Sequence, residues 1–200
     1  MINKTIITTS RRPTPVVRRF IKYLIPFIPN AQYQRRGKLT FTLLVLQAID
    51  FNADKIIVVR NRKGDPGYLD VYQVNYANKA LTKLCTLYIC GYSIDKNQTK
   101  LNTKQKIAQL LMLDSTLALI DNEDIAECLL TSFNIKICNE IPKLDYKSSY
   151  IHALLDIKKY FKKMNFTKLP VYEITFKNLR NEFIGPVIRI CKAKMYTKVT

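Results

Sequence analysis

The stretch TIITTSRRPTP, at residues 5–15, is typical of a strand that is joined to a helix through a basic turn. Residues 5–9 are β-branched throughout, which is typical of a short strand. Thr14 followed by Pro15 is typical of a helix start, with threonine as the cap and proline in the first turn. The apolar residues beyond them recur at helical spacing and predict one buried helix face: Val17, Phe20, Ile21 and Leu24.

The alternation of strands and helices continues through the first half of the chain. Residues 31–33 and 55–59 predict strands, and residues 39–51 predict a helix between them. Extended runs at 68–75 and 84–92 close this half. This order favours an α/β fold with a mixed sheet.

The second half repeats that order after a polar stretch, residues 95–103, that we interpret as a linker. It predicts helices at 104–113, 121–133 and 148–164, with Asp121 capping the second, and strands at 116–120, 135–137, 171–176 and 187–195. We therefore expect two similar tandem halves with mixed sheets, residues 1–97 and 98–200.

Positive charge is concentrated near the start of the chain. The protein has 200 residues and a formal charge of +18, and residues 1–63 hold 13 Lys+Arg against two acids, a net of +11. Because the arginine guanidinium matches phosphate oxygens in a planar fork, this segment favours a polyanionic partner over simple solubility. The stretch 107–135 is the opposite, with five acids and no base, and predicts either a docking face or a solvated helix.

The cysteines and the histidine do not form the pattern of a zinc site or of a catalytic site. The five cysteines contain no Cys-x-x-Cys pair and His152 is the one histidine, so we expect reduced, buried thiols and no zinc site. His152 and Asp156 are predicted to share one helix face without a nucleophile nearby.

No apolar run reaches the length of a membrane span, and Arg11 soon interrupts the first apolar residues. We expect a soluble, cytoplasmic protein without a membrane partner.

Motifs for nucleotide chemistry are incomplete. Arg36-Gly37-Lys38 is comparable to the end of a phosphate-binding loop, but Gln32 replaces the earlier glycine and Leu39 replaces the hydroxyl that holds magnesium. No G-x-G-x-x-G occurs among the five glycines. We therefore expect no cofactor, no metal, no small-molecule substrate and no enzymatic activity. A metal-dependent nuclease that uses Asp121 or Asp124 is the alternative, and a nonspecific nucleic-acid-binding protein is another.

Three short basic segments each follow a predicted strand, at residues 10–13, 35–38 and 60–64. Loops at the carboxyl ends of parallel strands gather at one edge of a sheet, where ligands usually bind. If the three strands are parallel, the loops form one arginine-rich surface, toward which the helix starts at Thr14 and near Leu39 aim backbone N–H groups. Otherwise each segment is a solvated turn. Their number favours a nucleic-acid site.

The same segments resemble the opening of the Brix domain, in the same order. The matching stretches are IITTSRRP at 6–13, IPNA at 28–31, RRGK at 35–38, ADKIIVV at 53–59 and RKGDPG at 62–67. Gly185-Pro186 and the alternating strand after it are similar to the C-terminal signature of that domain. Residues 95–172 match the pattern least. The short length resembles the archaeal members of the family.

The resemblance implies a ribosome biogenesis factor that binds ribosomal RNA during pre-rRNA processing and subunit assembly. It also implies two similar halves, each like the anticodon-binding domain of class II aminoacyl-tRNA synthetases. Ribosomal RNA or pre-rRNA is the expected partner, together with pre-ribosomal proteins. Tyr33 is a candidate for stacking on unpaired bases. The candidate RNA-binding residues are Arg11, Arg12, Arg18, Arg35, Arg36, Gly37, Lys38, Arg60, Arg62, Lys63 and Gly64.

Overall fold

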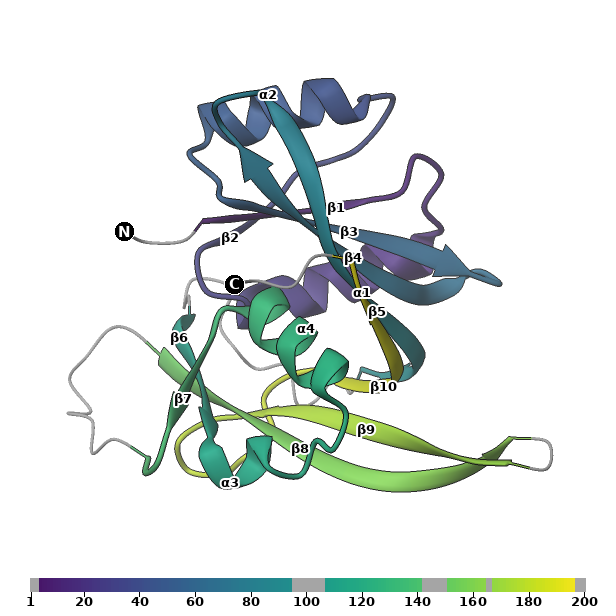
Figure 1. The fold of residues 1–200 in the computed structure, drawn as a ribbon, viewed down its shortest axis with the longest axis vertical. Helices are drawn as coiled ribbons and strands as arrows, with labels where there is room; N and C mark the ends of the chain where they lie inside the picture. The colour runs from purple at the N-terminus through teal and green to yellow at the C-terminus, as the bar shows by residue number, and fades with distance from the viewer. Residues whose placement is uncertain (1–3, 95–106, 142–150, 165–166, 197–200) are drawn as a thin grey trace.

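The computed structural model describes residues 4–94, 107–141, 151–164 and 167–196 (Figure 1). The first part of the chain contains β1 (Thr5–Thr9), α1 (Pro15–Leu24), a 3-10 turn η1 (Ile25–Phe27), β2 (Ala31–Tyr33), α2 (Phe41–Asp50), β3 (Lys55–Arg62), β4 (Asp65–Asn75) and β5 (Ala80–Ser93). The second part contains β6 (Ile107–Leu113), α3 (Asp114–Leu117), α4 (Glu123–Phe133), β7 (Ile135–Cys138), β8 (Ile151–Met164), β9 (Thr167–Lys177) and β10 (Val187–Met195).

The described strands form one sheet in the order β2-β1-β3-β4-β5-β10-β9-β8-β6-β7. β1 lies parallel between β2 and β3, and β6 lies parallel between β7 and β8. The series β3-β4-β5 and β8-β9-β10 are antiparallel, and β5 pairs with β10 in the middle. The order is therefore the same from either edge, and the predicted α/β fold with a mixed sheet is confirmed. The division at residues 97 and 98 and the linker at 95–103 lie outside the described residues.

Local sequence signals place the first elements correctly. β1 and β2 have the predicted bounds, and α1 begins after Thr14, whose hydroxyl accepts the backbone N–H of Val17 at 3.3 Å. The predicted strand at 187–195 is also found, as β10. These elements are correctly predicted because their signals, a β-branched run and a capped helix start, lie within a few neighbouring residues.

Several predictions in the second half are wrong. The predicted helices at 104–113 and 148–164 are strands in their described parts, β6 and β8, and the predicted strand at 116–120 begins as the single helical turn α3. β8 pairs with β9 over the whole stretch 154–164, and this cross-strand pairing overrides the helix-like spacing of its apolar residues. His152 and Asp156 therefore lie on a strand. Asn122, one residue beyond Asp121, caps α4 and accepts the N–H of Ile125 at 3.0 Å.

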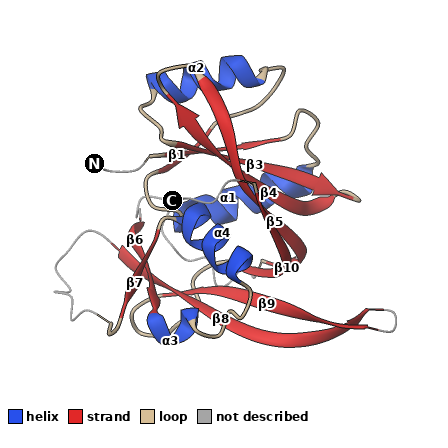
Figure 2. Cartoon of the chain, in the orientation of Figure 1, coloured by secondary structure: helices blue, strands red, loops and turns tan. Residues whose placement is uncertain are grey.

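The sheet has helices on both faces. On one face, α1 and α4 pack over side chains such as Ile57, Leu69 and Leu87 in a core that both halves share. On the other face, α2 packs over Ile56 and Val58. Figure 1 shows α2 at the top of the molecule, apart from α1 and α4, and Figure 2 shows β8 and β9 running beyond the helices as a long hairpin. None of the described helices is long and apolar enough to cross a membrane.

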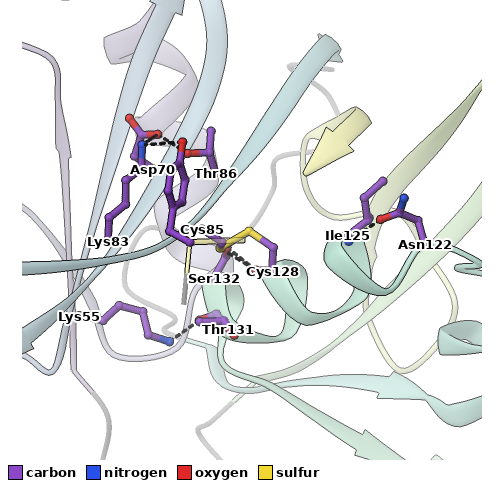
Figure 3. The surroundings of a disulfide bond; sticks show 11 residues. Lys55, Asp70, Lys83, Cys85, Thr86, Asn122, Ile125, Cys128, Thr131 and Ser132 are labelled. Carbon is purple, nitrogen blue, oxygen red and sulfur yellow. Dashed lines mark hydrogen bonds and ion pairs between the residues drawn. A yellow bond between two sulfur atoms is a disulfide. The ribbon is translucent and has the colours of Figure 1, made fainter. Parts of the chain in front are cut away.

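A disulfide joins the two halves inside the shared core. Cys85 of β5 is bonded to Cys128 of α4, with Cα atoms 5.8 Å apart (Figure 3). The prediction of reduced thiols is therefore wrong for this pair, while Cys90, Cys138 and Cys191 are free and half-buried. Tertiary packing alone brings Cys85 and Cys128 together, since 43 positions separate them in the sequence.

Candidate nucleic-acid interface

The loops after β1 and β3 are hydrogen-bonded to each other at one edge of the sheet. The backbone N–H of Ser10 donates to the carbonyl of Val59 at 3.0 Å, and its hydroxyl donates to the side chain of Asn61 at 3.4 Å. The hydroxyl of Thr14 donates to the carbonyl of Gly64 at 2.6 Å. The parallel arrangement expected from the sequence is present, because β1 lies beside both β2 and β3 in parallel.

The loop after β2 joins the same edge. The backbone N–H of Gln34 donates to the carbonyl of Ile7 at 2.9 Å, so residues 35–38 start beside the end of β1. Arg11 lies close enough to Arg36 to influence it electrostatically. Burial lowers the pKa of Arg36, and the charge of Arg11 lowers this pKa further. The structure therefore brings all three basic loops together.

The exposed cations on these loops, at the end of β3 and in the first turn of α1 form what we call the three-loop surface. Its members are Arg11, Arg12, Arg18, Arg35, Lys38, Arg62 and Lys63. All seven side chains are exposed, and Arg18 lies in the first turn of α1, next to the loop after β1. This arrangement gives a high density of positive charge at one edge of the sheet, which suits a polyanion.

Arg36 does not contribute its guanidinium to this surface. Its side chain is only 3% exposed and stacks on Phe41, with 4.4 Å between the guanidinium carbon and the ring centroid. Its Nε and Nη1 atoms are buried without a hydrogen-bond partner. Arg36 therefore lies beneath the surface that Arg35 and Lys38 form.

Arg60 is also engaged within the protein. Its guanidinium forms an ion pair with Asp70 and stacks on Tyr68 at 4.4 Å from the ring centroid. The hydrogen bond to Asp70 raises the pKa of Arg60. Because β3 continues through residue 62, Arg60 lies within a strand and not in a loop, contrary to the prediction.

The predicted loop at 61–67 is a tight hairpin turn. Only Lys63 and Gly64 lie between β3 and β4, and both have positive φ, 51° and 93°, as two-residue hairpins require. A Cβ at Gly67 would lie 2.3 Å from the Cβ of Arg62, so only glycine allows the strands to approach there. The turn therefore places Arg62 and Lys63 at the tip of the hairpin.

Both helix starts expected near this edge are present. Thr14 caps α1 while its hydroxyl also contacts Gly64, which fixes the start of α1 against the β3–β4 turn. Thr40 caps α2 and accepts the N–H of Leu43 at 3.2 Å, so α2 begins at Phe41 and not near Leu39. Gly37, in the loop before α2, has a φ of 50°, which glycine adopts without strain.

Sequence reasoning missed a polar network on β4 and β5. Asp70 is 2% exposed and accepts hydrogen bonds from Arg60 and from the hydroxyl of Thr86, and it forms an ion pair with Lys83 at 2.9 Å. Burial alone would raise the pKa of Asp70, but these interactions together lower it. In the sequence, Leu69 and Val71 alternate with polar residues. This alternation indicates that Asp70 lies on the sheet face opposite Leu69 and Val71, but it does not identify the hydrogen-bond partners of Asp70.

The acidic residues considered for a nuclease are not arranged as a metal site. The carboxylate of Asp121 accepts hydrogen bonds from Lys159 and Tyr172, and the bond from Lys159 lowers its pKa. Asp124 is exposed in the first turn of α4. In the part of the chain that the structure describes, no three His, Cys, Asp or Glu side chains gather around a point that could hold a metal ion.

Two kinds of sequence comparison were made, one with protein-family models and one with curated proteins. The search of protein-family models finds no match. A protein of Aeropyrum pernix, "Probable Brix domain-containing ribosomal biogenesis protein", is 46% identical over 67 residues, which are 34% of this chain and 37% of that protein. A protein of the same name from Pyrococcus horikoshii is 39% identical over 61 residues, 30% of this chain and 27% of that protein. The matches thus cover 37% and 27% of these relatives' lengths.

Solved structures match nearly the whole chain. A crystal structure of a probable ribosomal biogenesis protein from Aeropyrum pernix K1 covers 95% of this chain and 96% of its own, with a TM-score of 0.70 and 24% identity. The resemblance to the Brix domain family is confirmed. Mil, an archaeal Imp4-like protein, also has the same fold, with a TM-score of 0.58, 14% identity and coverage of 95% of this chain and 99% of its own. In this fold, the three-loop surface lies at the end of β1, β2 and β3.

Proposed function

We propose that this protein is a non-enzymatic, cytoplasmic factor of ribosome biogenesis that binds ribosomal RNA during pre-rRNA processing and subunit assembly. The names of the relatives from Aeropyrum pernix and Pyrococcus horikoshii support the role in ribosome biogenesis. The observation that carries RNA binding is the three-loop surface, in which seven exposed cations converge from neighbouring loops and the first turn of α1. Pre-rRNA is the principal partner, and pre-ribosomal proteins are further partners.

The chemistry of this surface explains why RNA is the proposed ligand. Arginine and lysine bind phosphate oxygens through charge-assisted hydrogen bonds, which position a nucleic acid without reading its sequence. Thr14 places the start of α1 beside the β3–β4 turn, where free backbone N–H groups favour anions. Arg36 has a supporting role, because its buried guanidinium stacks on Phe41 beneath the loop.

A salt titration tests this proposal. If about six phosphates are neutralised, the logarithm of the affinity for a structured rRNA fragment should fall with the logarithm of salt concentration at a slope of roughly −4 to −5. Reversing two charges, Arg35→Glu with Lys38→Glu, should weaken binding and flatten this slope by about two units. The matched control is Lys136→Glu with Arg180→Glu, which reverses two exposed charges elsewhere in the fold.

Two results would contradict the proposal. Binding that does not depend on salt, or equal affinity of the wild type and the Arg35→Glu, Lys38→Glu variant, would exclude the three-loop surface. Equal affinity for duplex DNA and structured rRNA would favour a nonspecific nucleic-acid-binding protein. Crosslinking in cells, followed by sequencing of the attached RNA, would identify the bound rRNA segment.

A further inference from the structure

The sheet face opposite α1 and α4 carries a second set of side chains suited to RNA. On this face, α2 packs near one end, over Ile56 and Val58, with Leu44 and Ala48 as its buried residues. The packed faces of α1 and α4 belong to the core on the other side. None of the described helices packs on this face over the middle of β5 or over β10. We call this face of β3, β4, β5, β10, β9 and β8, outside the area that α2 covers, the open sheet face.

A row of rings and cations crosses four strands of the open sheet face. The register pairs Arg60 with Tyr68, Tyr68 with Tyr88, and Tyr88 with Lys192. The guanidinium of Arg60 lies 4.4 Å from the ring centroid of Tyr68, and the two tyrosine rings are 5.3 Å apart. The ammonium of Lys192 lies 5.6 Å from the ring centroid of Tyr88. The two neighbouring rings therefore lie between two cations, and the row crosses from β3 to β10.

A second row runs beside the first. The ammonium of Lys83 lies 5.8 Å from the ring centroid of Tyr72 and 4.5 Å from that of Tyr196. Lys194 lies 4.9 Å from the same ring of Tyr196. Tyr196 is 45% exposed, so one of these rings is largely open to solvent.

Asp70 holds the two rows in place. It lies between them and interacts with Arg60 of the first row and Lys83 of the second, while Thr86 donates a hydrogen bond to it at 2.6 Å. Because Asp70 is buried, its carboxylate fixes these cations without being accessible to a ligand itself. Asp70 is therefore a positioning residue, and the rings and outer lysines are the ligand-facing groups.

The charge of this face complements a polyanion. The three carboxylates on it, Asp70, Asp156 and Glu173, are each ion-paired with a cation on the same face. The cations on it are Arg60, Lys83, Lys158, Lys162, Lys177, Arg189, Lys192 and Lys194. Eight cations against three carboxylates leave a net charge of +5. Exposed lysines next to rings are typical of surfaces that bind both the backbone and the bases of RNA.

We propose that the open sheet face binds single-stranded RNA, with unpaired bases stacked on Tyr68, Tyr88 and Tyr196 and phosphates held by Lys192 and Lys194. This inference rests on the proposed function and adds the class of RNA that the protein recognises. The bases of a duplex are already stacked on each other, so they cannot use these rings, whereas bases in loops can. The three-loop surface, which binds phosphates, does not make this distinction.

The test compares one short RNA of mixed sequence as a labelled single strand and as a blunt duplex, by fluorescence anisotropy. Tyr68→Leu with Tyr88→Leu should weaken binding of the single strand by at least about fivefold, because base–aromatic stacking is worth this much or more per base. Binding of the duplex should stay within about twofold of the wild type. Tyr68→Phe with Tyr88→Phe keeps both rings and should retain the affinity. Tyr76→Leu is the matched control, since Tyr76 is exposed outside these rows.

A second variant keeps the test valid if the leucine substitutions disturb folding. Lys192→Glu with Lys194→Glu changes only exposed side chains, and it should also weaken single-strand binding at least about fivefold. The chain has 12 tyrosines and no tryptophan, so quenching of tyrosine fluorescence by the single strand gives an independent signal.

The outcomes separate the two proposals. Unchanged single-strand binding in the leucine and glutamate variants, with weakened binding in the Arg35→Glu, Lys38→Glu variant, would overturn the open-sheet proposal and leave the proposed function intact. An equal loss for single strand and duplex in the leucine variant would overturn base stacking. No binding of either RNA by the wild type would overturn both proposals. Displacement of the single strand by a polyglutamate peptide at equal charge concentration would favour an acidic protein partner and overturn the RNA assignment.

Discussion

The ammonium of Lys55, at the start of β3, donates a hydrogen bond to the side-chain oxygen of Asn134, just beyond α4, at 2.6 Å. It also donates to the carbonyl of Thr131, and the amide of Asn134 donates to the hydroxyl of Thr5 at 3.2 Å. These bonds connect the last turn of α4 in the second half with the first strands of the sheet. Lys55 is only 8% exposed, and burial lowers its pKa to about 8.

Lys55 should make the free energy of unfolding depend on alkaline pH. Its pKa in the folded protein, about 8, is below the value near 10.5 for an exposed lysine, so the unfolded state binds more protons between these values. The free energy of unfolding should therefore rise with pH, by about 2 kcal/mol between pH 7 and pH 9.5 relative to Lys55→Met. Denaturant unfolding of both proteins measures this difference. Parallel pH profiles would show that Lys55 does not titrate in this range.

The disulfide should contribute strongly to stability. Closing a loop between Cys85 and Cys128, 43 positions apart, stabilises the folded state by about 4 kcal/mol in the chain-entropy model. Reduction by dithiothreitol should therefore lower the melting temperature by roughly 10 °C. The Cys85→Ala, Cys128→Ala variant should melt at the lower temperature with or without the reductant. Equal melting of the wild type under both conditions would mean that the bond does not form.

Gly185 should be intolerant of any side chain. A Cβ there would lie 2.8 Å from the Cβ of Phe176 and 2.9 Å from the Cζ of Phe27, and the two phenylalanine rings are themselves packed at 4.9 Å. Gly185→Ala should cost about 1–3 kcal/mol of unfolding free energy, as overpacking of a core does. Thermal and denaturant unfolding measure this cost.

Two further variants test the cause of that effect. Gly91→Ala is the matched control, because its Cβ would meet nothing closer than a flexible arginine side chain at 3.5 Å. Phe27→Leu should recover part of the loss when it is combined with Gly185→Ala, since it removes the Cζ atom of Phe27 that lies 2.9 Å from the new methyl group. If Gly91→Ala and Gly185→Ala cost the same, the replacement of a glycine by itself, and not the contact with Phe27, would explain the effect.

The first half of the fold could be predicted because its signals are local. The β-branched run of β1, the Thr14-Pro15 helix start and the Gly64 turn each act within a few residues. β8 shows the opposite case: Ala153, Leu154 and Ile157 are buried at spacings that fit a helix as well as a strand, and its pairing with β9 decides the structure. No pattern within β8 contains that information.

The candidate sites also differ in whether local sequence patterns could predict them. The three-loop surface could be predicted, because loops after parallel strands meet at one edge regardless of the details of packing. The pairing of Tyr88 with Lys192 could not, since more than half of the chain separates them and the β5–β10 register alone brings them together. The burial of Arg36 could not be predicted either, because the ring that covers its guanidinium belongs to Phe41, and the packing of α2 on the sheet places that ring.

Cys191 should be the most reactive free thiol near neutral pH. Cys90 and Cys191 lie on the paired strands β5 and β10, and the interaction with Cys90 lowers the pKa of Cys191 below the ordinary thiol value. Alkylation of Cys191 by iodoacetamide should therefore rise at a lower pH than that of an ordinary thiol, because the thiolate is the reactive form. Mass spectrometry of peptides from protein labelled at several pH values measures this rate.

Cys90→Ala removes the donor and should shift the midpoint of Cys191 alkylation toward the ordinary thiol range near 8.5. Cys138→Ala is the control, since Cys138 lies on β7 at the far edge of the sheet and should leave the midpoint unchanged. The charges of Arg62 and Lys162 also lower the pKa of Cys191, so the Cys90→Ala midpoint should still respond to salt, which screens these charges. A midpoint that does not move in Cys90→Ala would assign the lowered pKa to those cations alone.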